Sequence, residues 1–188
     1  RFWSTNPDML EAQSQLLQIW TSDPDMQDRV RRAYVEDSPH PEGYRLNLDD
    51  AEDGSAYSQF HARMHDSARL FVTERGYYDF FLISPAGDVL YTVEKETDFA
   101  TNLQSGPWRE SGLGEVFRKA RNARNEGSIV VTDLEPYGPS DDAPAIFMAT
   151  ALNDGSGNFL GVIAFQLPTD GILSIMNYTS GMGETGET

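Results

Sequence analysis

The chain has 188 residues, of which 39% are hydrophobic and 11% aromatic, enough for one folded domain with a buried core. Its 30 acidic and 14 basic residues give a net charge of −16, which repels nucleic acid and anionic membrane surfaces and suits a cationic or zwitterionic ligand. The absence of cysteine excludes disulfides, thiol nucleophiles and cysteine zinc sites.

The N-terminal part of the sequence predicts two helices. In TNPDMLEAQSQLLQIW, Asn6 is placed to cap a helix that begins at Pro7, and apolar residues recur at spacings of three and four. The DPD sequence at 23–25 repeats this start signal and predicts a second, short helix over 26–34. Each of these helices would bury one apolar face.

A longer helix and a hairpin are predicted next. After a turn-rich stretch, Ser55 is expected to cap a helix that runs to about Glu74 and stops at Gly76. Beyond it the period of the apolar residues changes. YYDFFLIS predicts a buried strand, PAGD a tight turn and VLYTVEKE a second strand. Because the turn is short, these two strands must be antiparallel neighbours.

The second half of the sequence predicts one helix and three further strands. DFATNLQSGPWRESG is a long irregular connection, after which Ser111 is placed to cap a helix that ends near Gly127. The expected strands are SIVVTDLEPY, APAIFMATAL and FLGVIAFQL, joined by short polar loops, and GILSIMNY is expected to form a last short helix.

This order of elements predicts an α+β, PAS-like fold. It has a five-stranded antiparallel sheet, N-terminal helices and a long connection that covers the sheet as a lid. A doubly wound parallel sheet would need helices between the strands, and these loops are too short to hold them. We expect an N-terminal helical segment and loop at 1–54, a PAS-like sensor unit at 55–177 and a hinge at 178–188.

Several short motifs match a functional pattern in part but lack the surrounding sequence that the function requires. GMGETGET satisfies G-x-G-x-x-G, but an expected helix precedes it, whereas a dinucleotide site needs a strand there. His61 and His65 lie one helical turn apart, yet a packed histidine pair is expected more often than a metal site. LDDAEDGS breaks the EF-hand pattern, and no G-x-S-x-G elbow is present. We therefore expect no catalytic residues, no metal and no cofactor.

A binding cavity between the sheet and its lid is the remaining prediction. Aromatic side chains with a polar tip would form its wall, and carboxylates would supply a counter-charge for an amine. The same residues would also suit plainer roles, capping the core or fixing turns. The candidate ligand-binding residues are Tyr91, Asp98, Asn102, Trp108, Asp133 and Tyr137.

The ends of the sequence suggest a segment of a longer protein. No apolar run approaches the roughly 18 residues of a membrane span, and no signal peptide stands at the start. The first residue is Arg1 and the last segment is polar. Any targeting or membrane segment is therefore expected to lie outside this sequence.

The stretch YYDFFLISPAGDVLYTVEKETDFATNLQSGPW resembles the double-Cache sensor modules of bacterial transmembrane receptors. The upstream LDDAEDGSAYSQFHARMHDSARLFVTERG and the downstream GVIAFQLP and GMGETGET are similar to the same group, so the resemblance covers roughly residues 48–188. In that family the module lies outside the cytoplasmic membrane, between two transmembrane helices. It passes ligand state to a chemotaxis, kinase or cyclase output.

The resemblance implies a periplasmic, non-enzymatic sensor of a small molecule, anchored to the inner membrane by flanking helices. The segment resembling GMGETGET would open a second, membrane-proximal unit that lies outside this chain. A side-by-side homodimer is expected from the amphipathic N-terminal helices. The amine-binding signature of the family, Tyr, Arg, Trp, Tyr and Asp, has no placement here, so no ligand identity carries over. The alternative is a ligand-free dimerisation or interaction module of the same type of receptor.

Overall fold

The computed structural model describes residues 7–123 and 128–169, and it has the predicted α+β architecture. Its helical elements are α1 (Pro7–Thr21), α2 (Met26–Arg31), the π-helical η1 (Arg32–Glu36), the 3-10 turns η2 (Arg45–Asn47) and η3 (Gly138–Ser140), α3 (Ala56–Arg75) and α4 (Gly112–Ala123). Its strands are β1 (Asp79–Ile83), β2 (Val89–Thr92), β3 (Ile129–Val131), β4 (Glu135–Tyr137), β5 (Ala143–Asn153) and β6 (Phe159–Leu167).

The sheet is antiparallel throughout its described pairings, as the short loops predicted. Its strand order is β2-β1-β6-β5-β3, and β4 also pairs with β5. The sheet therefore has six strands where five were expected, because the stretch 128–137 forms two short strands. Pro136 has no backbone N–H to donate and stands opposite Pro144, which limits the second of these strands to a short edge.

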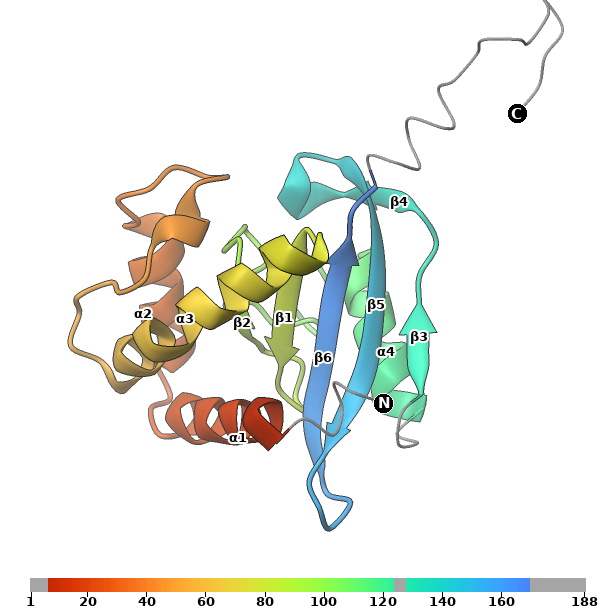
Figure 1. The fold of residues 1–188 in the computed structure, drawn as a ribbon, viewed down its shortest axis with the longest axis horizontal. Helices are drawn as coiled ribbons and strands as arrows, with labels where there is room; N and C mark the ends of the chain where they lie inside the picture. Colours follow the sequence, from red (N-terminus) through yellow and green to blue (C-terminus); the bar gives the residue numbers. More distant parts are fainter. Residues whose placement is uncertain (1–6, 124–127, 170–188) are drawn as a thin grey trace, which may run out of the picture.

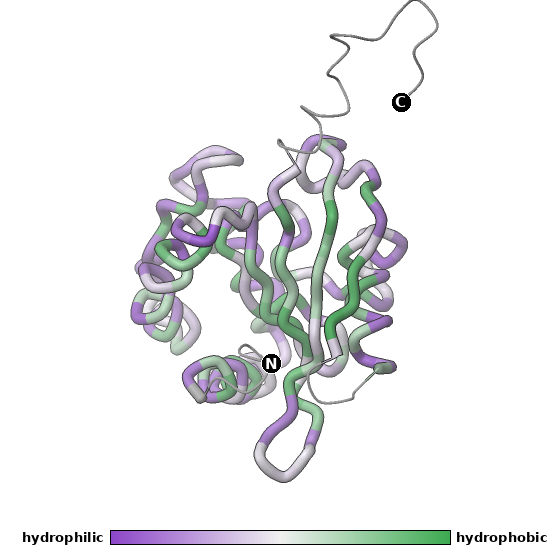
Figure 2. The backbone as a smooth tube through the Cα atoms, turned by 45° about the vertical axis from the view of Figure 1, so that its right-hand side comes forward, coloured by the Kyte–Doolittle hydropathy of each residue, from purple (hydrophilic) through white to green (hydrophobic). Residues whose placement is uncertain are grey.

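Helices cover both faces of the sheet. α3 crosses one face, which we call the helical face, and α4 lies behind the other, which we call the lid face (Figure 1). The rings of Phe80 and Phe165 pack against each other at a tilt on the helical face, where Phe71 of α3 also contacts Phe165. Phe81 and Phe147 meet on the lid face. Figure 2 shows that the apolar residues are concentrated along the strands between these helices.

The caps of α3 match their prediction. The Ser55 hydroxyl accepts a hydrogen bond from the Ser58 backbone N–H at 3.0 Å, and Gly76 ends the helix with a left-handed φ of 70°. Side chains of α3 then reach the core: Tyr57, Phe60 and Val72 are all buried. The helix is thus set at both ends by local sequence and oriented by its apolar stripe.

The N-terminal helices share the core of the sheet. The Gln13 side chain is fully buried in α1 and donates to the Ile83 carbonyl at 3.0 Å and the Leu160 carbonyl at 2.9 Å. Tyr34 belongs to the same hydrophobic cluster as the strands. The division at residue 54 stays a prediction. The Asn6 cap, the helix at 171–178 and GMGETGET lie outside the described residues.

Candidate functional site

The connection between β2 and α4, residues 93–111, forms the lid that the sequence predicted. Its backbone is tied to the hairpin, because the Val89 N–H donates to the Thr101 carbonyl at 2.9 Å and the Leu103 N–H to Gly87 at 2.8 Å. Lys95 and Ala100 both have left-handed backbones, with φ of 55° and 54°. Such conformations are costly for residues with a Cβ, so the four residues between them are held in a strained loop.

A row of polar and aromatic side chains lies on the lid face. Asp79 of β1, Gln166 of β6 and Phe147 of β5 stand opposite one another in the register of the sheet, so their side chains point to the same side. The ring of Tyr137 packs against that of Phe147 with the ring centres 4.8 Å apart. This row is the floor of the candidate site.

The lid places two carboxylates above this floor. Asp98 is fully buried, and one of its oxygens, Oδ2, accepts a hydrogen bond from the Tyr137 hydroxyl. Glu96 accepts from Tyr78 at 2.7 Å and from Ser140 at 2.7 Å. We call Asp79, Glu96 and Asp98 the acidic cluster.

Asp79 has a structural role within the acidic cluster. Its carboxylate accepts hydrogen bonds from the Thr92 hydroxyl at 2.5 Å and from the Val93 N–H at 2.8 Å. It also accepts from the Phe80 N–H at 2.6 Å. Asp79 therefore fixes the point where β2 ends and the lid begins.

The acidic cluster retains protons near neutral pH. Burial raises the pKa of Asp79 to about 7 and the pKa of Glu96 to about 7. Burial, followed by the negative charge of Glu96, raises the pKa of Asp98 well above its usual range. Within the described residues, none of the three carboxylates has an ion-pair partner.

The structure brings three of the six predicted residues together. Asp98 and Tyr137 are bonded directly. Trp108, half-buried, donates from Nε1 to the Thr97 carbonyl at 3.2 Å, and its ring lies against Gly138, where a Cβ would come within 2.6 Å of it. Trp108 thus covers the end of β4 beside the Asp98–Tyr137 pair.

The other three predicted residues lie elsewhere. Asn102 donates to Asp88 at 2.8 Å and to the Ala86 carbonyl at 3.1 Å, so it ties the lid to the hairpin turn. Asp133 is exposed between β3 and β4. Tyr91 points to the helical face, because it stands opposite Leu82 in the register and contacts His65. Whether any of the six binds a ligand stays a prediction.

Sequence reasoning missed Glu96, Ser140 and Gln166, which complete the site. One signal was present in the sequence, because Gln166 is the polar residue in the apolar strand FLGVIAFQL. Its Oε1 atom is buried and has no hydrogen-bond partner among the described residues. Buried amides without partners are rare, so such a position is worth examining.

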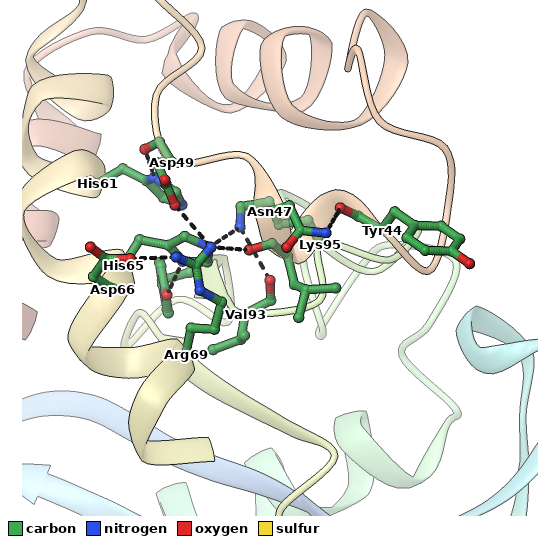
Figure 3. Close-up of polar contacts among 11 residues, drawn as sticks. Tyr44, Asn47, Asp49, His61, His65, Asp66, Arg69, Val93 and Lys95 are labelled. Atoms are coloured by element: carbon green, nitrogen blue, oxygen red, sulfur yellow. Dashed lines mark hydrogen bonds and ion pairs between the residues drawn. The ribbon is translucent and has the colours of Figure 1, made fainter. Parts of the chain in front are cut away.

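A second buried polar cluster lies on the helical face, between α3, the loop before it and the lid (Figure 3). Lys95 is fully buried, and its Nζ lies 3.0 Å from His65 Nε2 and 3.1 Å from the Val93 carbonyl. Nδ1 of His65 lies 2.6 Å from the Tyr91 hydroxyl, and its ring stacks on His61 at 4.4 Å. These contacts give the histidine pair a packing role.

Burial also controls the charges in this second cluster. It lowers the pKa of Lys95 to about 7, against the opposing pull of Asp79 and Glu94. Burial and then the charge of Lys95 lower the pKa of His61 to about 2 and that of His65 to about 3. In residues 7–123 and 128–169, no group of three or more His, Cys, Asp or Glu is placed to hold a metal ion.

Two open clefts lie away from the acidic cluster, near the N-terminal helices. One, of about 860 Å³, lies between Arg29 and Arg32 on one wall and Asp50 and Asp53 on the other. The second, of about 460 Å³, lies beside α2 and η1. Their lining residues include none of the six predicted residues, and the charged side chains there face solvent. As candidate ligand sites, these clefts are favoured only by their size. The acidic cluster is favoured by its buried polar atoms without hydrogen-bond partners.

Comparisons with known proteins gave structural neighbours only. A scan against protein-family models found no match, and a search of curated proteins found none either. The chain is similar to an extracellular ligand-binding receptor from Desulfohalobium retbaense, with 14% identity and a TM-score of 0.42, covering 92% of this chain and 27% of that one. It is also similar to the sensor domain of the Vibrio cholerae histidine kinase DctB, with 16% identity, a TM-score of 0.46 and coverage of 89% and 58%.

A third neighbour is the ligand-binding domain of the Pseudomonas aeruginosa amino-acid chemoreceptor PctC, solved with GABA. It shares 14% identity at a TM-score of 0.41, covering 91% of this chain and 62% of that one. The likeness to all three concerns the fold alone. The chain spans less than two thirds of each neighbour's length. In the part of the chain that the structure describes, no helix is both long and apolar enough to cross a membrane.

Proposed function

We propose that the chain is an extracytoplasmic ligand-sensing domain of a bacterial transmembrane receptor, of the chemotaxis or sensor-kinase type. It is not an enzyme. A small molecule binds between the lid face of the sheet and the lid, with Asp98, Tyr137 and Trp108 among its contacts. The full-length protein is anchored in the inner membrane by helices outside this chain, and the domain works in the periplasm as a homodimer.

The observation that carries this proposal is an unpaired buried oxygen. Asp98 is fully buried, yet its Oδ1 atom has no hydrogen-bond partner among the described residues. A buried polar atom without a hydrogen-bond partner costs about 1–3 kcal/mol. A group that the protein's own described residues leave unpaired is suited to gain that energy when a ligand supplies the missing hydrogen bond.

Signalling would follow from the position of the acidic cluster. Glu96 and Asp98 lie in the strained loop between Lys95 and Ala100, so a ligand at Asp98 displaces that loop directly. The Nζ of Lys95 contacts His65 of α3, which connects the same loop to a long helix. Gln166 lies at the end of β6, close to the point where the chain leaves the sheet. A coupling of a few kcal/mol through these contacts is enough to shift a two-state receptor.

A ligand-free interaction module is the alternative function, and one observation favours it. Ile129 and Val131 on the edge strand β3 are 54% and 50% exposed. Apolar side chains on an open sheet edge suit contact with another protein. In that case the lid face would only be part of the core.

A thermal-shift screen separates the two functions. Amines, carboxylates, amino acids and purines are added singly to the wild type and to Asp98→Asn, which keeps the shape of the side chain and replaces the carboxyl group with an amide that cannot ionise. A ligand that binds only the folded state raises the melting temperature. We expect at least one compound to stabilise the wild type and to lose most of that effect in Asp98→Asn. If no compound stabilises the wild type, the domain is not a direct sensor.

A further inference from the structure

The partners of His65 decide which of its ring nitrogens carries a proton. Burial lowers the pKa of His65 to about 3, so at ordinary pH the ring is neutral and has one N–H group. Nε2 lies 2.8 Å from the Leu46 carbonyl, which can only accept, so Nε2 carries the proton. Nδ1 is then the acceptor, and the Tyr91 hydroxyl donates to it at 2.6 Å.

Lys95 must be neutral beside this form of the ring. In residues 7–123 and 128–169, Nζ of Lys95 has two hydrogen-bond partners, His65 Nε2 at 3.0 Å and the Val93 carbonyl at 3.1 Å (Figure 3). An ammonium group has three N–H donors and no lone pair, so next to Nε2–H it would place donor against donor. A neutral amine accepts the Nε2–H group with its lone pair and donates to Val93. The geometry therefore describes Lys95 without its charge.

The charges around Lys95 come from every element packed against it. Burial lowers the pKa of Lys95 to about 7. Arg69 of α3 acts in the same direction, and Arg45 of η2 donates to the Lys95 carbonyl at 3.2 Å. Three carboxylates oppose the shift, namely Asp79 of β1, Glu94 of the lid and Asp49 of the loop before α3. Burial keeps His61 of α3 and Tyr91 of β2 uncharged near neutral pH.

One added proton disrupts the hydrogen bonds of this cluster. As Lys95 becomes an ammonium, the Nε2 proton passes to Nζ and the incoming proton is held at Nδ1, so the pair gains one proton in all. The Leu46 carbonyl then faces an Nε2 that no longer donates, and the Tyr91 hydroxyl loses the acceptor of its own proton. Lys95, His65 and Tyr91 are fully buried, so water does not replace these bonds while the lid is closed.

We propose that Lys95 and His65 form a pH switch that holds the lid against α3, firmly when the pair is neutral and weakly when it has taken up one proton. Lys95 begins the strained loop that ends at Ala100, and His65 lies within α3, so their contact joins the two elements. The switch goes beyond the proposed ligand sensing. Its signal is the proton, and its residues lie on the helical face, away from the acidic cluster.

The working range of the switch follows from two pKa values of Lys95. With the lid closed the pKa is about 7, and with the lid away from α3 it returns to its ordinary value of 10.5. The open form binds the proton more tightly, so the closed form is favoured at high pH and loses this advantage as the pH falls through that range. The equilibrium constant for opening should rise by up to about tenfold per pH unit and level off below about pH 7.

NMR of the wild-type domain tests the two protonation states. We expect the ¹³C shift of Lys95 Cε to titrate with a midpoint of about 7. The ¹⁵N shifts of the His65 ring should change from the Nε2–H form to the Nδ1–H form at the same midpoint. An ordinary Lys95 midpoint near 10.5, or a His65 ring whose tautomer does not change with pH, overturns the switch.

Amide hydrogen exchange measures the opening of the lid. The Val89 N–H is bonded to the Thr101 carbonyl and the Phe99 N–H to the Glu96 carbonyl, so both are protected while the lid is closed. The exchange rate of the wild type is divided by that of Lys95→Met, in which the acidic cluster and the intrinsic pH dependence of exchange are unchanged. We expect this ratio to rise by up to about tenfold per pH unit from pH 9 to pH 7.

A variant of equal charge serves as the control for this exchange experiment. Lys119→Met removes one positive charge at an exposed position, and its exchange should follow the wild type at every pH. A wild-type to Lys95→Met ratio that does not change with pH contradicts the proposal. The same change in Lys119→Met would show that net charge, and not the Lys95–His65 pair, controls the lid.

His65→Gln separates switching from packing. A glutamine amide carries a donor and an acceptor together, so it can serve the Leu46 carbonyl and the Lys95 ammonium without any tautomer change. We expect the Lys95 midpoint in this variant to rise by at least about one pH unit, because the ammonium gains an acceptor. An unchanged midpoint would mean that His65 only packs. Circular dichroism checks that the variant folds, and if it does not, the wild-type titration and the exchange ratio still decide.

Discussion

Asp98 is one of the buried ionisable residues whose burial costs this fold free energy. Its carboxyl group is buried, accepts a hydrogen bond from the Tyr137 hydroxyl, and lies near the charge of Glu96. Removing a carboxylate from water disfavours its ionised form, so the raised pKa and the unpaired oxygen have the same cause. This buried and partly unpaired carboxylate is the reason that we propose the ligand site here.

The stability of Asp98→Asn should depend on pH. The folded-state pKa of Asp98 is raised, so its contribution to stability is present below the unfolded pKa near 4 and is lost as the pH rises. At pH 7 we expect the variant to be more stable than the wild type by about 1 kcal/mol, or about 2–4 °C in melting temperature. At pH 3 the two should unfold together. Asp133→Asn should show no such difference, and a destabilised Asp98→Asn at pH 7 would contradict the assignment.

For Lys95 we predict the opposite dependence of stability on pH. Burial lowers its pKa to about 7, so the stability it contributes is present above the unfolded pKa near 10.5 and is lost as the pH falls through 7. Lys95→Met keeps the length of the side chain without the charge. We expect it to raise the free energy of unfolding at pH 6 by at least about 1 kcal/mol, and to flatten the rise in stability above pH 7.

Urea unfolding at pH 6, 8 and 10 measures this effect. Lys119→Met changes the net charge equally at an exposed position, so it is the matched control, and its unfolding should follow the wild type at every pH. Equal shifts in the two variants would mean that net charge, and not the burial of Lys95, sets the pH dependence.

At the scale of elements, a glycine of β6 lies where β1 and α1 come into close contact with that strand. Gly161 of β6 has a φ of 136°, and a Cβ there would lie 2.1 Å from the Ile83 carbonyl of β1 and 2.4 Å from the Gln13 amide of α1. Neither the strand backbone nor the fully buried glutamine has room to move. The glycine is therefore required for α1 to dock on the β1–β6 pair.

Gly161→Ala should destabilise the domain by more than about 3 kcal/mol, because it adds a steric clash to an unfavourable backbone angle. Gly155→Ala lies in the nearby β5–β6 loop with nothing within 4 Å of its Cβ, and it should unfold with the wild type. Urea titration followed by circular dichroism compares the two. A Gly161→Ala domain as stable as the wild type would mean that α1 docks differently.

At the scale of the whole molecule, the local elements were the predictable part. The Ser55 cap, the Gly76 stop and the PAGD turn act over a few residues, so helix α3 and the β1–β2 hairpin followed from sequence. The antiparallel order followed from the loop lengths. The break between β3 and β4 depends on pairing with β5, which a local pattern does not contain.

The candidate site was predictable only in part, because its residues come from distant segments. Asp98 and Tyr137 were named for their chemistry, and they meet across 39 positions of sequence. Tyr91 was predicted to lie with them. Successive side chains of a strand point to opposite faces of the sheet, however, and it is the neighbouring Thr92 that faces the lid. Ser140 and Gln166 carry no local signal of proximity to Glu96, so only the folded chain brings them together.

The central claim is that a small molecule is sensed at the acidic cluster under the lid. The most direct measurement is ¹⁵N–¹H NMR of the assigned domain, titrated with the compound that gives the largest thermal shift. We predict that the amide shifts change most at Glu96, Asp98, Trp108, Tyr137 and Gln166, and that the same titration leaves Asp98→Asn largely unchanged. Changes confined to the cleft between Arg32 and Asp53, or spread evenly over the surface, would contradict this claim.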